Sequence, residues 1–354
     1  MLFKRLNISF YKKIKLLIIK NGFQIPNYFF WKKLWDNNPK TIIGDGLFFK
    51  NNLVGYHSYF RKKLVFRGKN YNILVSSNWN VEKKFRNYSI FLINRYFNIK
   101  NDIFLTTTAN DKVSEIWKTL GAKEVNNSGC KKIIFKILNS KNFINIYGKK
   151  KKLSFLIFLS PFLQIFLDIY IKLKSNPRSN KDYNFKHSTN LDLEINKFNL
   201  MYENDSEYPM EKRSKKELQK YLNIINHNKN FYIIKIYKKL ILVGYAILIR
   251  EKIKNSKYKR MYMAEIRMNN NCQNNINEVF NHMAIFSKKK KCDVIEYRNL
   301  NSRILKKIKN KYYFARYVKN NPYLIKFGPN ISHELKKYTK INWETSYLDG
   351  DCLL

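Results

Sequence analysis

A four-residue pattern occurs twice in this chain and constrains its architecture more than any other feature. Leu53-Val54-Gly55-Tyr56 recurs as Leu242-Val243-Gly244-Tyr245, and each copy lies in an apolar run that predicts a strand hairpin. The copies are about 190 residues apart, so a repeat of this kind would be a unit of domain size.

The elements that follow each copy agree in type and order. Each half continues with a long strand, an amphipathic helix, a second strand, an asparagine and another helix. Asn110 and Asn301 are the asparagines, at nearly the same offset as the hairpin pattern. The long strand and its helix fall at 71–81 and 84–97 in the first half and at 262–268 and 274–287 in the second, and the later elements fall at 103–125 and 293–318. The sequence therefore predicts two diverged copies of one mixed α/β unit.

Length and composition permit two such units. The 354 residues suffice for two cores, and 45% hydrophobic with 16% aromatic residues is the composition of a folding chain. The predicted division is a first domain at 1–148, a connecting amphipathic helix and linker at 149–190, and a second domain at 191–354. The Asn, Lys and Ser residues of 175–187 indicate a surface linker there.

The formal net charge of +44 has two explanations. An excess this large suits nucleic acid, an anionic membrane surface or phosphorylated ligands. However, Lys, Asn, Ile, Phe and Tyr, whose codons are AT-rich, are abundant, whereas Gly and Pro number only 11 and 7. The basic residues are also spread along the chain, while a nucleic-acid site would be a patch. We therefore expect genome composition to be the main cause of the excess.

An apolar segment at 153–171 lies between the two halves. Its length is nearly that of a membrane-spanning helix. Ser160, Gln164, Asp168 and Lys172 are spaced four apart, so they form one polar stripe on an otherwise apolar helix. A spanning helix would also separate the two related halves. We expect a helix lying in the interface of an anionic membrane, with a buried connecting helix and a spanning helix as alternatives.

Cysteine and histidine are not arranged for metal binding. Cys130, Cys272, Cys292 and Cys352 form no CxxC pair, and the five histidines lack metal-ligand spacing. The basic N-terminal stretch has too short an apolar run for a signal peptide. The sequence therefore predicts a cytoplasmic protein without disulfides or a metal.

One stretch of the first half suits a phosphorylated ligand. After the strand that ends near Val81, the run Arg86-Asn87-Tyr88-Ser89-Ile90-Phe91 opens an amphipathic helix. Free backbone N–H groups and the positive end of a helix dipole attract a pyrophosphate. Arg86 adds a charged donor, and Ser89 is a candidate helix cap. An ordinary turn between strand and helix explains the same residues without a ligand.

The order of elements as a whole resembles the Gcn5-related N-acetyltransferase (GNAT) domain. Val81, Arg86 and Ser89 are similar to the V-x-P-x-x-R-G-x-G/A region that binds the coenzyme A pyrophosphate in that family. Asn110, Trp117 and Gly121-Ala122 are similar to its N-x-x-A-x-x-x-Y-x-x-x-G-F stretch. The resemblance implies an α/β fold of two tandem GNAT-like domains, each a mixed, mostly antiparallel sheet flanked by helices.

Both ends of the chain resemble one group within this family. Trp35 with Asn38-Pro39, and the end from Trp343 to Asp349-Gly350-Asp351, are similar to the ends of GNAT-type proteins of surface-polysaccharide gene clusters. This resemblance implies an amino sugar or a lipid-linked precursor as the acceptor.

The resemblance also implies a mechanism. Acyl-CoA lies where two parallel strands diverge, and a substrate amine attacks the thioester directly, so catalysis depends on positioning and on a base. The implied cofactor-binding residues are Asn80, Val81, Arg86, Asn87, Tyr88, Ser89, Ile90, Phe91 and Asn110. Ser89 and Phe91 stand where the family has glycines, and Trp117 stands where it often has a tyrosine that protonates the thiolate.

Two carboxylates are candidates for the base. Glu82 follows the proposed acyl-binding strand, and Glu265 lies on the corresponding strand of the second half. Each is also explained as a solvated carboxylate at a strand end.

These expectations combine in one function with two alternatives. The chain is expected to be an N-acyltransferase that moves an acyl group from acyl-CoA to an amino sugar or lipid-linked precursor, in the cytoplasm or at the inner face of the membrane. FemAB-type enzymes also pair two such domains but take an aminoacyl group from tRNA, which a basic surface suits. The third interpretation is a non-catalytic scaffold at the membrane, which the missing glycines and tyrosine favour.

Overall fold

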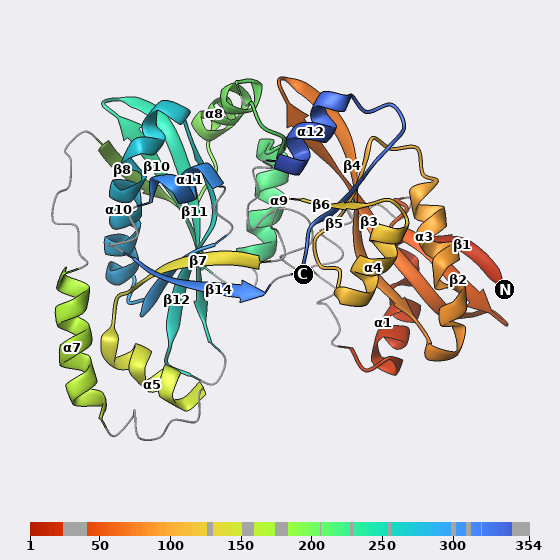
Figure 1. The fold of residues 1–354 in the computed structure, drawn as a ribbon, viewed down its shortest axis with the longest axis horizontal. Helices are drawn as coiled ribbons and strands as arrows, with labels where there is room; N and C mark the ends of the chain where they lie inside the picture. Colours follow the sequence, from red (N-terminus) through yellow and green to blue (C-terminus); the bar gives the residue numbers. More distant parts are fainter. Residues whose placement is uncertain are drawn as a thin grey trace.

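The chain forms two mixed sheets with helices on their faces (Figure 1). The predicted α/β fold class is confirmed. This computed structural model describes residues 1–23, 41–125, 130–150, 159–173, 183–205, 207–226, 230–253, 256–298, 302–308, 313–319 and 321–341. The sequence markers Trp35, Asn38, Pro39 and Asn301, and the terminal stretch from Trp343 to Asp351, lie outside the described residues.

The first sheet has the strand order β1-β2-β3-β4-β5-β15-β6, with β9 paired to β3 off this path. Neighbouring strands are antiparallel except β4 and β5, which are parallel. Its strands are β1 (Leu2–Leu6), β2 (Gly44–Phe49), β3 (Asn52–Phe66), β4 (Lys69–Val81), β5 (Ile103–Thr106), β15 (Leu324–Phe327), β6 (Lys123–Glu124) and β9 (Met210–Glu211).

The second sheet repeats this plan, apart from β9. From one edge to the other its order is β8-β10-β11-β12-β13-β7-β14, and β12 and β13 are its parallel pair. Its strands are β8 (Tyr183–Ser188), β10 (Asn230–Lys238), β11 (Ile241–Lys252), β12 (Lys259–Met268), β13 (Val294–Tyr297), β7 (Cys130–Ile137) and β14 (Phe314–Lys319). The repeated tetrapeptide occupies equivalent places, with Gly55 opposite Val81 and Gly244 opposite Met268.

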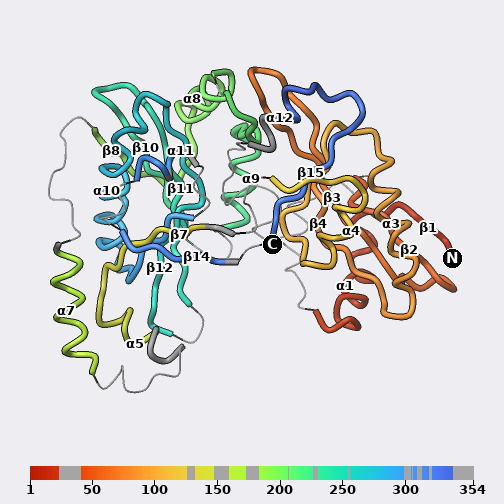
Figure 2. Tube along the Cα trace, in the orientation of Figure 1, coloured from red at the N-terminus to blue at the C-terminus, as the bar shows by residue number. Residues whose placement is uncertain are grey.

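The two halves exchange one strand each. β7 comes from the first half of the chain but lies between β13 and β14, and β15 comes from the second half but lies between β5 and β6. Figure 2 shows this as the blue β15 among the orange strands and the yellow β7 beside the blue β14. The predicted boundaries at residues 148 and 191 therefore do not separate the two sheets.

Helices cover both faces of the first sheet. The 3-10 turn η1 (Ile8–Phe10) leads into α1 (Tyr11–Lys20), which with α12 (His333–Ile341) packs on one face, while α3 (Ser89–Phe97) and α4 (Asp111–Thr119) pack on the other. In α1 the buried residues are Ile14, Leu17 and Ile18, a helical spacing that places them on one side.

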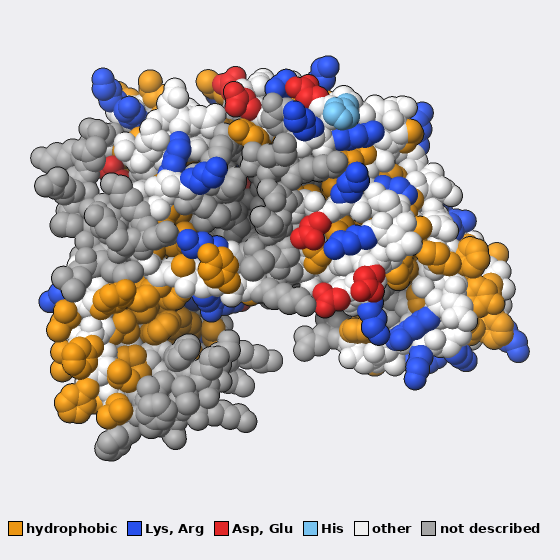
Figure 3. Space-filling model, viewed as in Figure 1, with side chains coloured by type: hydrophobic (Ala, Val, Ile, Leu, Met, Phe, Trp, Pro, Cys, Tyr) orange, Lys and Arg blue, Asp and Glu red, His pale blue; other side chains and the backbone are white. Residues whose placement is uncertain are grey.

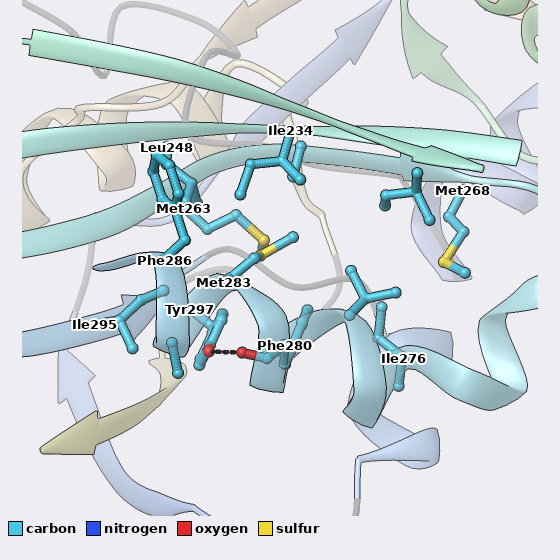
Figure 4. Close-up of a cluster of buried hydrophobic side chains, with 14 of the residues drawn as sticks. Ile234, Leu248, Met263, Met268, Ile276, Phe280, Met283, Phe286, Ile295 and Tyr297 are labelled. Atoms are coloured by element: carbon cyan, nitrogen blue, oxygen red, sulfur yellow. Dashed lines mark hydrogen bonds between the residues drawn. The ribbon is translucent and has the colours of Figure 1, made fainter. Parts of the chain in front are cut away.

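The second sheet is covered in the same way. On one face α10 (Ile276–Lys289) and α11 (Ser302–Lys307) pack, and on the other α8 (Leu193–Asn204) and α9 (Lys215–Asn226). Figure 4 shows the core between α10 and the sheet, where the Tyr297 hydroxyl donates a hydrogen bond of 2.6 Å to the Phe280 carbonyl. Its labelled side chains are Ile234, Leu248, Met263, Met268, Ile276, Phe280, Met283, Phe286, Ile295 and Tyr297.

The connecting region contains α5 (Ser140–Lys150) and α7 (Ser160–Leu173), which contact each other beside β7. Across the described ranges, no helix is both long enough and apolar enough to cross a membrane. The predicted surface linker is wrong for its last part, because residues 183–188 form β8. Tyr183 is buried and Phe185 stacks on His282, so alternation in this polar run places one side of the strand against the core.

Candidate active site

The parallel pair of the first sheet opens at one end. β4 pairs with β5 only as far as Ser76, which lies opposite Thr106, whereas β4 continues to Val81. A bulge also interrupts its pairing with β3, because His57 faces Trp79 while Tyr59 faces Ser76. We call the segment of β4 from Ser77 to Val81, beyond the end of β5, the first fork.

The backbone of the first fork is available for hydrogen bonding on one side. Among the described residues, no strand pairs with its edge toward β5. Asn78, Trp79 and Asn80 are half-buried, so the edge is not deep in the core. An extended ligand that carries amide groups can pair with such an edge in the manner of an added strand.

The turn that follows β4 is basic and exposed. It is the 3-10 helix η2 (Lys83–Tyr88), which leads directly into α3, and its cations Lys83, Lys84 and Arg86 are exposed. Within this turn the Ser89 N–H bonds to the Arg86 carbonyl, and the Phe85 N–H bonds to the Glu82 carbonyl. Fewer backbone N–H groups are therefore open to an anion than at a simple helix start, and the side-chain cations supply the main attraction.

The predicted pyrophosphate residues lie on the surface of this turn. Tyr88, Ile90 and Phe91 are exposed, and the Phe91 ring centre is 6.2 Å from that of Phe3. The predicted cap at Ser89 is wrong, because α3 has Tyr88 at its N-cap position and no side-chain cap. The exposed Arg86 and Asn87 stay candidates for phosphate contact.

The residues from Asn110 to Ala122, which resemble the second GNAT motif, have structural roles. The Asn110 side chain accepts a hydrogen bond of 3.0 Å from the Val113 N–H and so caps α4. Trp117 is fully buried, and Gly121 has φ +88, which favours glycine just after a helix end. These residues fix the helix beside the fork.

Glu82 lies at the end of the first fork under the last turn of α1. Its carboxylate is 2.9 Å from the Lys20 ammonium, and the Asn21 side chain donates to Asn80. Glu82 is buried, whereas the Lys20 side chain is 62% exposed. Among the described residues, the Glu82 carboxylate is therefore paired with one exposed lysine.

His57 lies beside the first fork and was missed in the sequence. Its Nε2 is 2.7 Å from Ser76 Oγ, and its ring packs against Trp79 and Tyr96. Complete burial lowers the pKa of His57 to about 3, so the ring is neutral near pH 7. The signal was present, since His57 directly follows the repeated tetrapeptide and is a polar residue within a buried strand.

The second sheet opens at the equivalent place. β12 pairs with β13 only as far as Met263, then continues to Met268 past a bulge near Ala264. We call the segment from Ala264 to Met268 the second fork. The turn after it, η3 (Asn270–Asn275), has the geometry of η2: its N-cap Asn269 has φ −52 and ψ 138, and Glu82 has φ −55 and ψ 142.

The second fork has different chemistry. Glu265 is buried, and its two carboxylate oxygens each accept a hydrogen bond of 2.9 Å, from Arg213 and Arg267. The turn after the fork carries asparagines instead of cations. Glu265 is therefore held as an ion-pair partner, whereas Glu82 has one exposed partner.

The ion pairs of Glu265 belong to a buried cluster between the two sheets. Lys62 of β3 is 2.6 Å from Glu211, which is 2.7 Å from Arg213. Burial alone raises the pKa of Glu211, but Arg213 and Lys62 outweigh it and hold that pKa below its usual range. The buried cluster has as many acidic as basic members: Lys62, Glu203, Glu211, Arg213, Glu265 and Arg267.

A cleft of about 530 Å³ lies beside the second fork, between α8, the start of β11 and the start of η3. Glu194, Lys197 and Asp205 supply its charged side chains. In the first half the end of α1 contacts the equivalent place, where Lys20 pairs with Glu82 and Asn21 donates a hydrogen bond to Asn80. Among the described residues, no group of three or more His, Cys, Asp or Glu side chains is arranged to hold a metal ion.

Comparisons with known proteins agree on the fold. No family model and no curated protein matches the sequence. A GCN5-related N-acetyltransferase from Anabaena variabilis ATCC 29413 has TM-score 0.60 at 8% identity, over 92% of this chain and 72% of that chain. A probable N-acyltransferase from Enterococcus faecalis V583 has TM-score 0.59 at 10% identity, over the same shares.

A third structure extends the comparison to another acyltransferase. Saccharomyces cerevisiae N-myristoyltransferase with bound myristoyl-CoA has TM-score 0.51 at 10% identity, over 96% of this chain and 84% of that chain. The expected resemblance to GNAT proteins is therefore confirmed for the fold. The FemAB-like type and the origin of the halves by duplication stay predictions.

Proposed function

We propose that this protein is an N-acyltransferase that binds acyl-CoA at the first fork and passes the acyl group to an amine. One observation carries the proposal: β4 extends beyond its parallel partner β5, and among the described residues no strand pairs with that edge, which lies directly before an exposed basic turn. The edge suits the amides of a pantetheine chain, and Lys83, Lys84 and Arg86 suit its phosphates. The bound myristoyl-CoA of the yeast structure supports acyl-CoA as the donor.

The reaction needs little from the protein beyond positioning and one base. The amine nitrogen bonds to the thioester carbonyl carbon, the carbon–sulfur bond breaks, and coenzyme A leaves as a thiolate that takes up a proton. Glu82 is the base we assign for the amine proton, since its exposed partner Lys20 can move away. Glu265 is the weaker candidate, because two buried arginines hold it.

The acceptor is proposed from the resemblance of the chain ends. An amino sugar or a lipid-linked precursor of surface polysaccharide supplies the amine, and the protein works in the cytoplasm or at the inner face of the membrane. An anionic membrane surface is a partner in this proposal.

Thermal unfolding with candidate donors tests the proposal, because a ligand of the folded state raises its stability by about 2.7 kcal/mol at a hundred times its dissociation constant. We expect coenzyme A and acetyl-CoA to raise Tm, and mass spectrometry to detect an acylated amino sugar. Glu82→Gln should keep the Tm response and lose the product. Stabilisation by tRNA alone, at raised salt, would replace the proposal with the FemAB-type alternative. No response from folded protein would favour the scaffold.

A further inference from the structure

Helix α7 presents an apolar face to solvent. Phe162 and Phe166 are 66% and 71% exposed, and Ile165, Ile169 and Tyr170 beside them are also exposed. Their spacing of three and four residues places them on one side of the helix. Figure 3 shows them as an orange patch over α7 at the lower left. An exposed patch of this kind on an otherwise highly charged chain indicates a docking surface.

The opposite side of α7 is the more polar one. Gln164 and Asp168 are half-buried there, while Leu167 and Ile171 pack against the core below β7 and β14. The polar stripe expected from the sequence is half-buried from Ser160 to Asp168, and its last member, Lys172, is exposed. The apolar side is the more exposed side of the helix. A helix that only connects two parts of the chain would turn its apolar side toward the protein and its polar side toward solvent.

Cations gather beside this helix. A groove of about 400 Å³ between α7 and α10 is lined by Lys136, Lys172 and Lys288, with Asp168 as its acidic residue. Lys136 donates a hydrogen bond of 3.2 Å to Asn281, which also lines the groove. Burial lowers the pKa of Lys136 to about 8, so its ammonium is poorly solvated and a nearby phosphate would stabilise it.

We propose that α7 docks this protein on an anionic phospholipid bilayer, with its outward face at the acyl-chain boundary and a lipid phosphate in the groove between α7 and α10. Apolar area and positive charge are the two forces that hold an amphipathic helix in the membrane interface, and here they lie next to each other. The net charge of +44 attracts the same surface over a longer range. The proposal concerns docking and holds whether or not acyl transfer occurs.

Vesicle flotation with the full chain at physiological ionic strength tests this proposal. We expect the protein to float with vesicles of phosphatidylglycerol and phosphatidylcholine in equal parts, and to bind pure phosphatidylcholine at least tenfold more weakly. Phe162→Asp with Phe166→Asp should weaken binding to the mixed vesicles about tenfold, which is about 1.4 kcal/mol. The control Leu240→Asp, at a 92% exposed turn away from α7, should bind as the parent does.

A second pair of variants tests the groove. Lys172→Glu with Lys288→Glu should remove the preference for phosphatidylglycerol, whereas Lys216→Glu, at an exposed position of α9, should keep it. All of these changes are at exposed or groove positions, so Tm should stay within a few degrees of the parent. Unchanged flotation of the Phe162→Asp, Phe166→Asp protein would overturn the proposal. So would a dimer that these two changes dissociate, since the face would then bind a second copy.

Discussion

The two forks share one backbone plan and differ in the charges placed on it. The first fork has a half-buried edge, a basic turn and a carboxylate whose partner is exposed. The second fork has a neutral turn and buries Glu265 between two arginines. The difference shows that one backbone plan accommodates two charge arrangements. Charge at the surface suits a ligand, and balanced charge in the interior joins the two sheets.

Cutting the chain between the halves should have the largest effect. Residues 1–148 lack β15, which joins β6 to β5 in the first sheet, and residues 191–354 lack β7, which joins β14 to β13 in the second. Each piece would expose unpaired strand edges, so we expect no cooperative urea transition from either piece alone, followed by circular dichroism. The intact chain is the control. Cooperative unfolding of one separate piece would contradict the strand exchange.

Replacing one carboxylate in each half should show that the two forks contribute differently to the free energy of unfolding. Glu265→Gln leaves two buried arginines with less compensation, and we expect a loss of about 3–5 kcal/mol in the free energy of unfolding. Glu82→Gln removes a pair whose lysine is exposed, and the loss should be below about 1 kcal/mol. Urea denaturation measures both. Equal losses would mean that the two carboxylates have the same role.

A negative charge introduced at equivalent turn positions should show which fork binds coenzyme A. Lys84 and Asn271 occupy the same place in η2 and η3, and both are exposed. Lys84→Glu should weaken coenzyme A binding about tenfold, or about 1.4 kcal/mol, because it places a negative charge beside the phosphates. Asn271→Glu should leave the affinity unchanged. Titration calorimetry compares them, and the reverse result would move the site to the second fork.

The buried His57 should change how stability depends on pH. Its pKa is lowered from 6.5 to about 3 in the folded chain, so between these values the unfolded chain binds more protons. Stability is therefore lost as the pH falls through this range, by at most about 1.4 kcal/mol per pH unit. His57→Gln should flatten the slope of the unfolding free energy between pH 6 and 4, in a series of urea titrations. The parent protein, measured in the same series, is the control.

Much of the fold could be predicted from the sequence because it depends on local periodicity. The long apolar runs of β3 and β11 and the helical spacing in α3 and α10 fix the elements, and the repeated tetrapeptide aligns the halves. The strand exchange could not be predicted. β7 is a short strand with several isoleucines, and local pattern does not determine which sheet it completes.

The site could be predicted only in part, for a related reason. The basic turn after β4 is contiguous in sequence, so Arg86 and its neighbours could be located. The ion pair between Glu265 and Arg213 joins residues 52 positions apart, and no periodicity relates them. The direction of α7 was also beyond the sequence, since spacing defines a polar stripe but does not decide whether it faces the protein or the solvent.

Hydrogen exchange of the two forks with and without acetyl-CoA tests the central claim most directly. If acyl-CoA pairs with the open edge of β4, amides from Ser77 to Val81 and those of η2 should exchange more slowly when it is bound, while Ala264 to Met268 should not change. Peptide-level mass spectrometry resolves these two segments. Protection at the second fork alone, or at neither fork under saturating acetyl-CoA, would contradict the account.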